Sequence, residues 1–460
     1  MQVEKKKLNA FDIYTLGVGG AIGSGIFVMM GSGIAYTGRS IVLAVSVGCL
    51  YMLLAYLFHP VMSSMFVVPG GDYDMKAMLL GPTMTGFSAL TNVVGSLGMA
   101  SYSISFASYF TSVFTGLADY QEWIALLIPL IFFAFSIRGP KALATLTSVI
   151  TVILLVSIVV FIGVGVPQVQ PGYWSNADGG FWVDGFSGFI GAIAMMSFAC
   201  QGSTMGPVSV MPVTKNARRV IPLTILFITL TVGVVYGLMA YVAAGVLSLD
   251  QVAGQNLSVV ASAIFNPALF AVFILGAACC AILSSFASGL TQIRYPLQSV
   301  ANDGWLPSVF KKTTKNGYPY VVMGLYLIFA IVPIFTSLSV DTLISLTMIP
   351  MMIINTYMNI SLIRLVKKYP APWKNSVLHM PFPLFCCLCA LGTLCALAVA
   401  YYLFIALDVT SMILCVVILA VLLILSRVQL MRGVVKKEDL LAKREEIAAA
   451  ALAATAAEDN

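Results

Sequence analysis

The sequence predicts an all-α integral membrane protein with about twelve transmembrane helices. Of its 460 residues, 60% are hydrophobic and only 9% are charged, whereas soluble domains carry about 25% charged residues. The mean hydropathy of the chain is +0.98. A helix needs roughly 20 apolar residues to cross a bilayer, and such runs occur at 12–38, 41–67, 83–115, 122–137, 142–166, 185–210, 221–247, 264–293, 320–337, 342–363, 381–406 and 409–427.

The positions of the basic residues support this topology. If the N-terminus is cytoplasmic, every Lys and Arg except Arg39 falls at a cytoplasmic end of a predicted span or in a cytoplasmic segment. Cytoplasmic loops of membrane proteins carry an excess of Lys and Arg. The pattern agrees with an even number of spans and with both termini in the cytoplasm. We therefore attribute the net charge of +6 to topology and expect no nucleic-acid partner.

The chain divides into a cytoplasmic N-terminal tail (1–11), a membrane domain (12–430) and a cytoplasmic C-terminal tail (431–460). The C-terminal tail is charged and then Ala-rich, which suits either a cytoplasmic helix or an unstructured segment. All nine Cys lie inside predicted spans, and none has metal-site spacing with a His. We interpret them as small apolar packing residues, and we expect neither a bound metal nor a cofactor.

The first span contains a glycine-rich stretch, with seven Gly between Gly17 and Gly33. Each Gly costs roughly 1 kcal/mol relative to Ala in a helix, so we expect the helix to open near Gly23 and Gly25. Unpaired N–H groups are tolerated at membrane depth only where they line a cavity, and the N-terminus of a half-helix suits a carboxylate. In the alternative interpretation, these glycines only allow helices to pack closely.

A second interruption is predicted in the sixth span, where Gly202, Gly206 and Pro207 break an apolar run. The first and sixth spans would begin two halves of five spans each, 12–166 and 185–364. An odd number of spans per half inverts the second half in the membrane. Interrupted spans in matching positions of two halves indicate the midplane binding site of a transporter, so we favour a functional role for both breaks.

Six short motifs occur in order along the chain: Gly23–Phe27, Pro69–Tyr73, Phe198–Gly202, Lys215–Pro222, Asp303–Pro307 and Arg364–Pro370. In these motifs, and over about residues 8–430, the chain resembles the amino acid–polyamine–organocation (APC) superfamily of amino-acid permeases. The resemblance implies a leucine-transporter-like 5+5 inverted repeat with discontinuous helices 1 and 6. It also implies two additional C-terminal helices (381–427) and transport by alternating access.

The resemblance also implies where the substrate binds. Its carboxylate would meet the N–H groups around Ser24 and Gly25. Its amino group would meet carbonyls near Ile22 and those of Phe198, Ala199 and Gln201. Phe198 would be an aromatic gate, and Cys200 and Gln201 would border the pocket for the substrate side chain. The predicted substrate-binding residues are Ile22, Gly23, Ser24, Gly25, Phe198, Ala199, Cys200, Gln201 and Gly202.

The residues that couple transport to an ion are less clearly marked. Some relatives of the superfamily carry a Lys in span 5 or an acid after the span 6 Gly, but this chain has Thr204 at the latter position. His59 could titrate near neutral pH, but we favour the interpretation of a satisfied packing or interfacial histidine. Ser284 and Ser285 could line a sodium site, because hard cations prefer oxygen ligands, or they could pack helices.

These features predict a secondary active permease for a neutral or zwitterionic amino acid or a close derivative, working as an exchanger or ion-coupled symporter. The alternative is a transporter of cationic amino acids or polyamines, or an amino-acid/amine antiporter. Against that alternative, all 18 Asp and Glu lie at the ends of predicted spans or outside them, although cation–π contact with Phe198 or with tyrosines could compensate. An enzyme is not expected, because positioned acid, base or metal groups are missing; a permease-derived sensor is a remote alternative. We expect a multi-pass cell-membrane location in a bacterium, with the lipid bilayer and a small amino acid or amine as partners.

Overall fold

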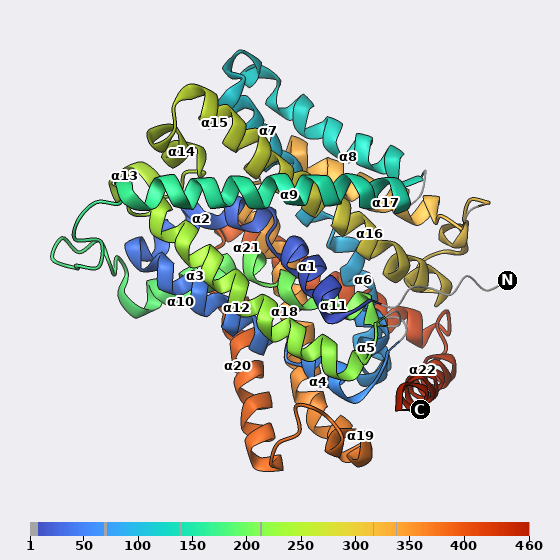
Figure 1. Cartoon of the computed structure of the whole chain (residues 1–460). Coiled ribbons are helices and arrows are strands. Elements are labelled where there is room, and N and C mark those ends of the chain that lie inside the picture. Colours follow the sequence, from blue (N-terminus) through green and yellow to red (C-terminus); the bar gives the residue numbers. More distant parts are fainter. Residues whose placement is uncertain are drawn as a thin grey trace.

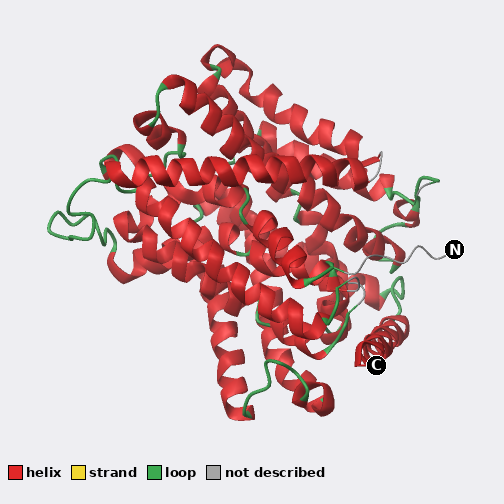
Figure 2. Ribbon diagram, viewed as in Figure 1, coloured by secondary structure: helices red, strands yellow, loops and turns green. Residues whose placement is uncertain are grey.

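The computed structural model describes residues 8–68, 71–137, 140–211, 214–315, 317–336 and 338–459. Within these ranges every named element is a helix, and one isolated β-bridge pairs Leu8 with Thr214. Figure 2 shows the helices joined mostly by short loops, with one long irregular segment at the left. Pro69 and Gly70 of one predicted motif lie outside the described residues.

The described residues of the first half of the membrane domain form nine α-helices. The first predicted span (12–38) is divided into two helices at a break. The second (41–67) and third (83–115) spans are each divided into two consecutive helices at a short kink. The helices are α1 (Ala10–Ala21), α2 (Ser24–Thr37), α3 (Ile41–Ala55), α4 (Phe58–Met65), α5 (Gly71–Leu79), α6 (Pro82–Val94), α7 (Leu97–Val113), α8 (Gln121–Ile137) and α9 (Pro140–Gly165).

The second half again begins with a divided helix and contains several short elements between the long ones. Its helices are α10 (Gly185–Cys200), α11 (Gly202–Ser209), α12 (Ala217–Ala243), α13 (Leu249–Val252), α14 (Ser258–Ile264), α15 (Pro267–Phe273), α16 (Cys280–Asn302), α17 (Tyr320–Ile331), α18 (Val340–Lys368) and α19 (Pro370–Lys374). A π-helical turn, Ile274–Cys279, joins α15 to α16.

The chain ends in two long apolar helices and one charged helix. These are α20 (Phe382–Ile405), α21 (Val409–Met431) and α22 (Lys437–Asp459). Helix α20 packs along α18 and against α3, and its far end extends from the bundle beside α19 in Figure 1. The C-terminal tail is therefore a helix, one of the two states expected from its sequence.

Eight helices in the described part of the chain are long and apolar enough to cross a membrane. One of them combines α2 with α3, and two shorter apolar helices, Val152–Gln168 and Tyr320–Phe335, come in addition. Each of the twelve segments predicted from the sequence coincides with a helix or with consecutive helices. The all-helical membrane class is confirmed, whereas the count of twelve spans and the inverted repeat remain predictions.

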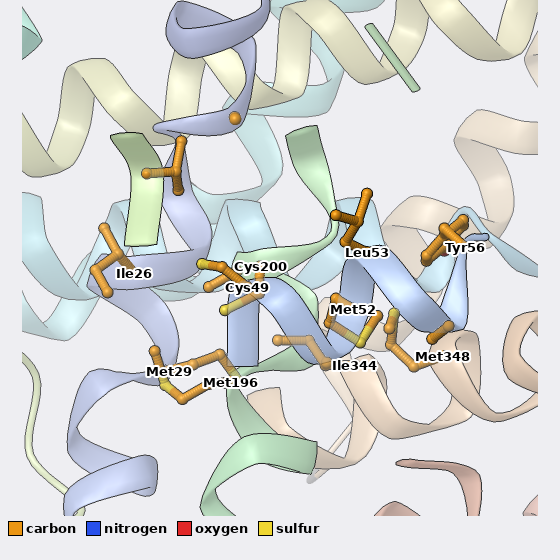
Figure 3. Packing of buried hydrophobic residues seen from close by; sticks show 14 of the residues in the cluster. Ile26, Met29, Cys49, Met52, Leu53, Tyr56, Met196, Cys200, Ile344 and Met348 are labelled. Carbon is orange, nitrogen blue, oxygen red and sulfur yellow. The ribbon is translucent and has the colours of Figure 1, made fainter. Parts of the chain in front are cut away.

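The core of the bundle lies where α2, α3, α10 and α18 meet. Helix α10 packs against both α2 and α3, and α12 covers α3. Figure 3 shows Ile26 and Met29 of α2 beside Cys49, Met196 and Cys200. All of these side chains are buried. This core places α2 and α10, the two helices that adjoin the predicted breaks, side by side.

The long segment between α9 and α10 is fastened to the start of α3. Arg39 donates hydrogen bonds to the carboxylate of Asp178, at 2.8 and 2.6 Å, and to the carbonyl of Tyr173. The Tyr173 hydroxyl in turn donates to the carbonyl of Arg39. The adjacent guanidinium holds the pKa of Asp178 well below its usual range. This segment was predicted to be an external loop, and Arg39 is the one basic residue predicted on that side.

Candidate functional site

The first predicted break is present and falls at Ile22 and Gly23. Helix α1 ends at Ala21, and the Ile22 N–H still donates to the carbonyl of Val18 at 2.8 Å. Gly23 then has extended dihedral angles, φ −130° and ψ −155°, and α2 begins at Ser24. The first N–H groups of α2 have no partner within the helix. The break therefore presents the positive end of α2 inside the bundle.

Two side chains from other helices satisfy part of this opened backbone. The Ser24 N–H donates to the Ser285 Oγ at 2.9 Å, and the Tyr236 hydroxyl donates to the carbonyl of Ala21 at 2.8 Å. The Ser24 Oγ is buried and forms no hydrogen bond of ordinary geometry within the described chain, and the Tyr102 hydroxyl of α7 is the polar side chain that interacts with it. Buried hydroxyl groups nearly always have a partner. The Ser24 side chain is therefore a polar group at the break that a ligand could engage.

The second break is shallower than the sequence suggested. Helix α10 ends at Cys200 and α11 begins at Gly202, with Gln201 between them. Gln201 keeps nearly helical angles, φ −75° and ψ −19°, and its N–H donates to the carbonyl of Ser197 at 3.0 Å. Because the turn is retained, the chain changes direction here without a long unpaired stretch.

The two breaks contact each other through glycines. A Cβ atom added at Gly25 would lie 2.5 Å from the Cα of Ala199, and one at Gly202 would lie 2.9 Å from the Cα of Ala21. Contacts under 3.0 Å to backbone force a displacement. At these positions Gly permits the close helix packing that was the alternative interpretation. The close packing and the opened backbone therefore occur together.

Aromatic and amide side chains surround the second break. The Phe198 ring lies 5.6 Å from the ring of Tyr102 of α7, centroid to centroid. The Tyr56 hydroxyl donates to Gln201 Oε1 at 2.9 Å. Phe198 and Gln201 are partly exposed, whereas Ala199 is buried against Gly25. Phe198 and Gln201 therefore lie at the second break, where the sequence analysis expected them.

Cys200 points away from the breaks. Its thiol donates to the carbonyl of Val45 at 3.7 Å, and its side chain lies beside Cys49 in the core between α3 and α10 (Figure 3). Of the other predicted substrate-binding residues, Gly25 packs against Ala199 and Gly202 packs against Ala21, across the contact between α1–α2 and α10–α11. Gly23 and Ser24 instead adjoin Ser285 of α16.

Sequence reasoning missed two tyrosines that bond to backbone carbonyls of α1 and α2. Besides Tyr236, the Tyr109 hydroxyl donates to the carbonyl of Phe27 at 2.6 Å and accepts the N–H of Leu257 at 3.0 Å. A single Tyr in an apolar helix gives no periodic signal, so these roles could not be read from spacing. The π-helical turn before α16 was also unexpected, and such turns often occur near functional sites.

His59 lies in a buried polar chain that reaches out from α11. Its Nδ1 lies 3.0 Å from the Thr204 Oγ1, and its Nε2 lies 2.8 Å from Asp72 Oδ1. The Lys76 ammonium lies 2.7 Å from the other oxygen of Asp72. Burial alone would raise the pKa of the Asp72 carboxyl, but Lys76 and the hydrogen bond from His59 hold that pKa below its usual value. His59 is thus paired at both ring nitrogens. Ser285, another residue proposed for ion coupling, lies elsewhere and contacts the first break.

Comparison with known proteins identifies the family. A family model described as amino acid permease matches residues 8–426. The chain belongs to the amino acid permease family. This match confirms the resemblance to the APC superfamily, and it confirms that the chain is a multi-pass transporter of small molecules and not an enzyme.

Curated relatives of this permease carry different substrates. A branched-chain amino acid permease of Bacillus subtilis is 25% identical over 344 residues, which cover 69% of this chain and 72% of that protein. A gamma-aminobutyric acid permease of the same organism is 25% identical over 343 residues, which cover 68% of this chain and 69% of that protein. A human cationic amino acid transporter 4 is 26% identical, but the match covers only 48% of this chain and 38% of that protein.

Proposed function

We propose that this permease transports a neutral or zwitterionic amino acid, or a close derivative, by alternating access around the paired breaks. The observation that carries the proposal is the opened backbone at Gly23, where the N-terminal end of α2 adjoins Ala199 and the Ser24 hydroxyl is buried without a hydrogen bond of ordinary geometry in the described chain. A half-helix N-terminus favours a carboxylate. The C-terminal end of α10 offers carbonyl groups that suit an ammonium group.

The charges around the breaks favour a substrate whose only positive charge is its α-ammonium group, with an uncharged side chain. In the described part of the chain, no carboxylate forms a hydrogen bond with any of the nine predicted substrate-binding residues. A cationic side chain in this region would have no carboxylate partner, and buried unpaired charges are costly. The partial similarity to a cationic amino acid transporter keeps the alternative of a cationic amino acid or amine substrate open to test.

We further propose that coupling, if the permease is a symporter, uses one of two places. Ser285 adjoins the first break, and Ser284 precedes Ser285 in α16; hydroxyl and carbonyl oxygens there suit sodium. His59 of α4 connects Thr204 to Asp72 and could carry a proton between α11 and the start of α5. The same proposal assigns both termini to the cytoplasm, from the distribution of basic residues. The short loops and compact chain favour a bacterial plasma membrane.

The test is counterflow into proteoliposomes. Labelled amino acids and amines are supplied outside, with the unlabelled compound inside, in the presence and absence of a pH or sodium gradient. Accumulation of a neutral amino acid that depends on the internal compound identifies an exchanger, and accumulation driven by a gradient identifies a symporter. Accumulation of amines alone contradicts the proposed substrate class, and saturable binding without flux contradicts transport.

A further inference from the structure

A cavity of about 370 Å³ lies at the end of the bundle that carries the C-terminal helix, between α18, the end of α5 and α22. Figure 1 shows α22 beside α5. The cavity is separate from the two breaks, and it shares no residue with the predicted substrate site. Its volume falls within the range of small-molecule sites, about 300–1,000 Å³.

One face of each of two helices lines this cavity with polar side chains. From α18 come Ser361, Arg364 and Lys368, whose spacing of three and four residues puts them on one helix face. From α22 come Arg444 and Glu445. Three cations and one carboxylate give the lining a net charge of +2. Two tyrosines, Tyr357 and Tyr369, border the same space.

The three cations have no ion pair among the described residues. Lys368 lies over the ring of Tyr369, 5.3 Å from its centroid, while neither Arg364 nor Arg444 forms a hydrogen bond or ion pair within the described chain. An excess of Lys and Arg at this end agrees with membrane topology. Topology does not require that cations of two different helices converge on one cavity, where they repel each other.

Contacts outside the cavity hold α22 in place, so they, and not the cavity lining, bring Arg444 close to the cations of α18. The Lys443 ammonium, one residue before Arg444, lies 2.6 Å from Asp303, which also accepts the hydroxyl of Tyr73 at 2.6 Å. Near the other end of α22, the Thr455 Oγ1 accepts the N–H of Val67 at 3.1 Å. These contacts fix the face that α22 presents to the cavity.

We propose that this cavity binds a phosphate group, which bridges Arg364 and Lys368 of α18 to Arg444 of α22. A phosphate monoester carries close to two negative charges at neutral pH, which matches the net charge of the lining. Arg binds phosphate through two parallel hydrogen bonds, and the Ser361 and Tyr hydroxyls can donate to the remaining oxygens. The phosphate group belongs either to the headgroup of an anionic lipid or to a soluble phosphate compound. In either case its binding strengthens the attachment of α22 to the bundle.

The experiment uses the full-length permease in phosphatidylcholine nanodiscs and chloride buffer. Two probes are added separately: inorganic phosphate in solution, or phosphatidic acid incorporated in the nanodisc. Thermal stability and hydrogen exchange of α22 are measured with each probe, against chloride of equal ionic strength. We expect a higher melting temperature and slower exchange in α22. A response to phosphatidic acid alone assigns a lipid headgroup, and a response to inorganic phosphate assigns a soluble ligand.

Two charge-matched variants make the test specific. Arg364→Gln removes a cavity cation, whereas Lys367→Gln removes a cation from the same helix that lies over Phe382, outside the cavity. We expect Arg364→Gln to weaken the apparent Kd for the active probe by at least about tenfold and Lys367→Gln to leave it within twofold. Equal weakening in both variants overturns the proposal. So does unchanged exchange of α22 in the wild-type protein with both probes, a measurement that does not depend on how any variant folds.

Discussion

Replacing Gly25 with Ala tests how closely the two breaks must approach. The new Cβ would lie 2.5 Å from the Cα of Ala199, whereas ordinary contacts begin at 3.4 Å, so α2 and α10 must separate by about 0.9 Å. Overpacking of this kind costs roughly 1–3 kcal/mol. The same displacement separates the Ser24 N–H from the end of α10, and losing one hydrogen bond to a charged group costs about 1.5–3 kcal/mol. We therefore expect substrate affinity to fall by roughly 10- to 100-fold.

The assay is substrate binding and counterflow by Gly25→Ala protein, with Gly20→Ala as the matched control. Gly20 lies in α1 of the same predicted span, is exposed, and an added Cβ meets nothing within 4 Å. Ala at position 20 should leave transport unchanged and stabilise the helix slightly. The reasoning is refuted if Gly25→Ala protein, reconstituted to the same level, binds and transports substrate like the Gly20→Ala control.

Three further predictions concern the groups around the breaks and the buried polar chain. Ser285→Ala removes the acceptor of the Ser24 N–H, so we expect a lower melting temperature without substrate than in the wild type. Adding substrate should then raise the melting temperature of the variant by more than it raises that of the wild type; an equal rise in both proteins contradicts this. Tyr236→Phe leaves the buried carbonyl of Ala21 without a donor and should lower the free energy of unfolding by about 1–3 kcal/mol, as measured by denaturation in detergent. Because the folded-state pKa of Asp72 is below its usual value, the stabilisation it provides is fully present above about pH 4 and is lost as the pH falls through the folded-state pKa. Thermal unfolding of the wild type minus that of Asp72→Asn should thus give a constant difference between pH 5 and 8, and a difference that falls across this range would contradict the assignment.

The glycine pattern of the first span predicted the break correctly because its cause is local. Seven Gly within seventeen residues weaken any helix, and the chain opens at Gly23. The depth of the second break was not predictable in the same way. Pro207 lies within the helix that follows, where it only removes a donor, and Gln201 keeps helical angles.

The partners of the opened backbone depend on helix packing, which spacing within one helix does not encode. Tyr236 and Ser285 come from helices far along the chain and reach Ala21 and Ser24 only in the folded bundle. Cys200 is next to Gln201 in sequence, but consecutive residues of a helix point in different directions, and its thiol faces α3. The site was therefore predictable by segment, but not by the direction of each side chain.

The central claim is that the amino-acid carboxylate binds the start of α2 at the first break. The most direct measurement is the nitrogen-15 chemical shift of the Gly23, Ser24 and Gly25 amides in selectively labelled protein, followed during titration with the transported amino acid. The account predicts saturable shifts at Ser24 and Gly25 that are absent with the corresponding decarboxylated amine, while Gly20 stays unchanged. Equal shifts with the amine, or no shift at Ser24 and Gly25 at saturating amino acid, would contradict it.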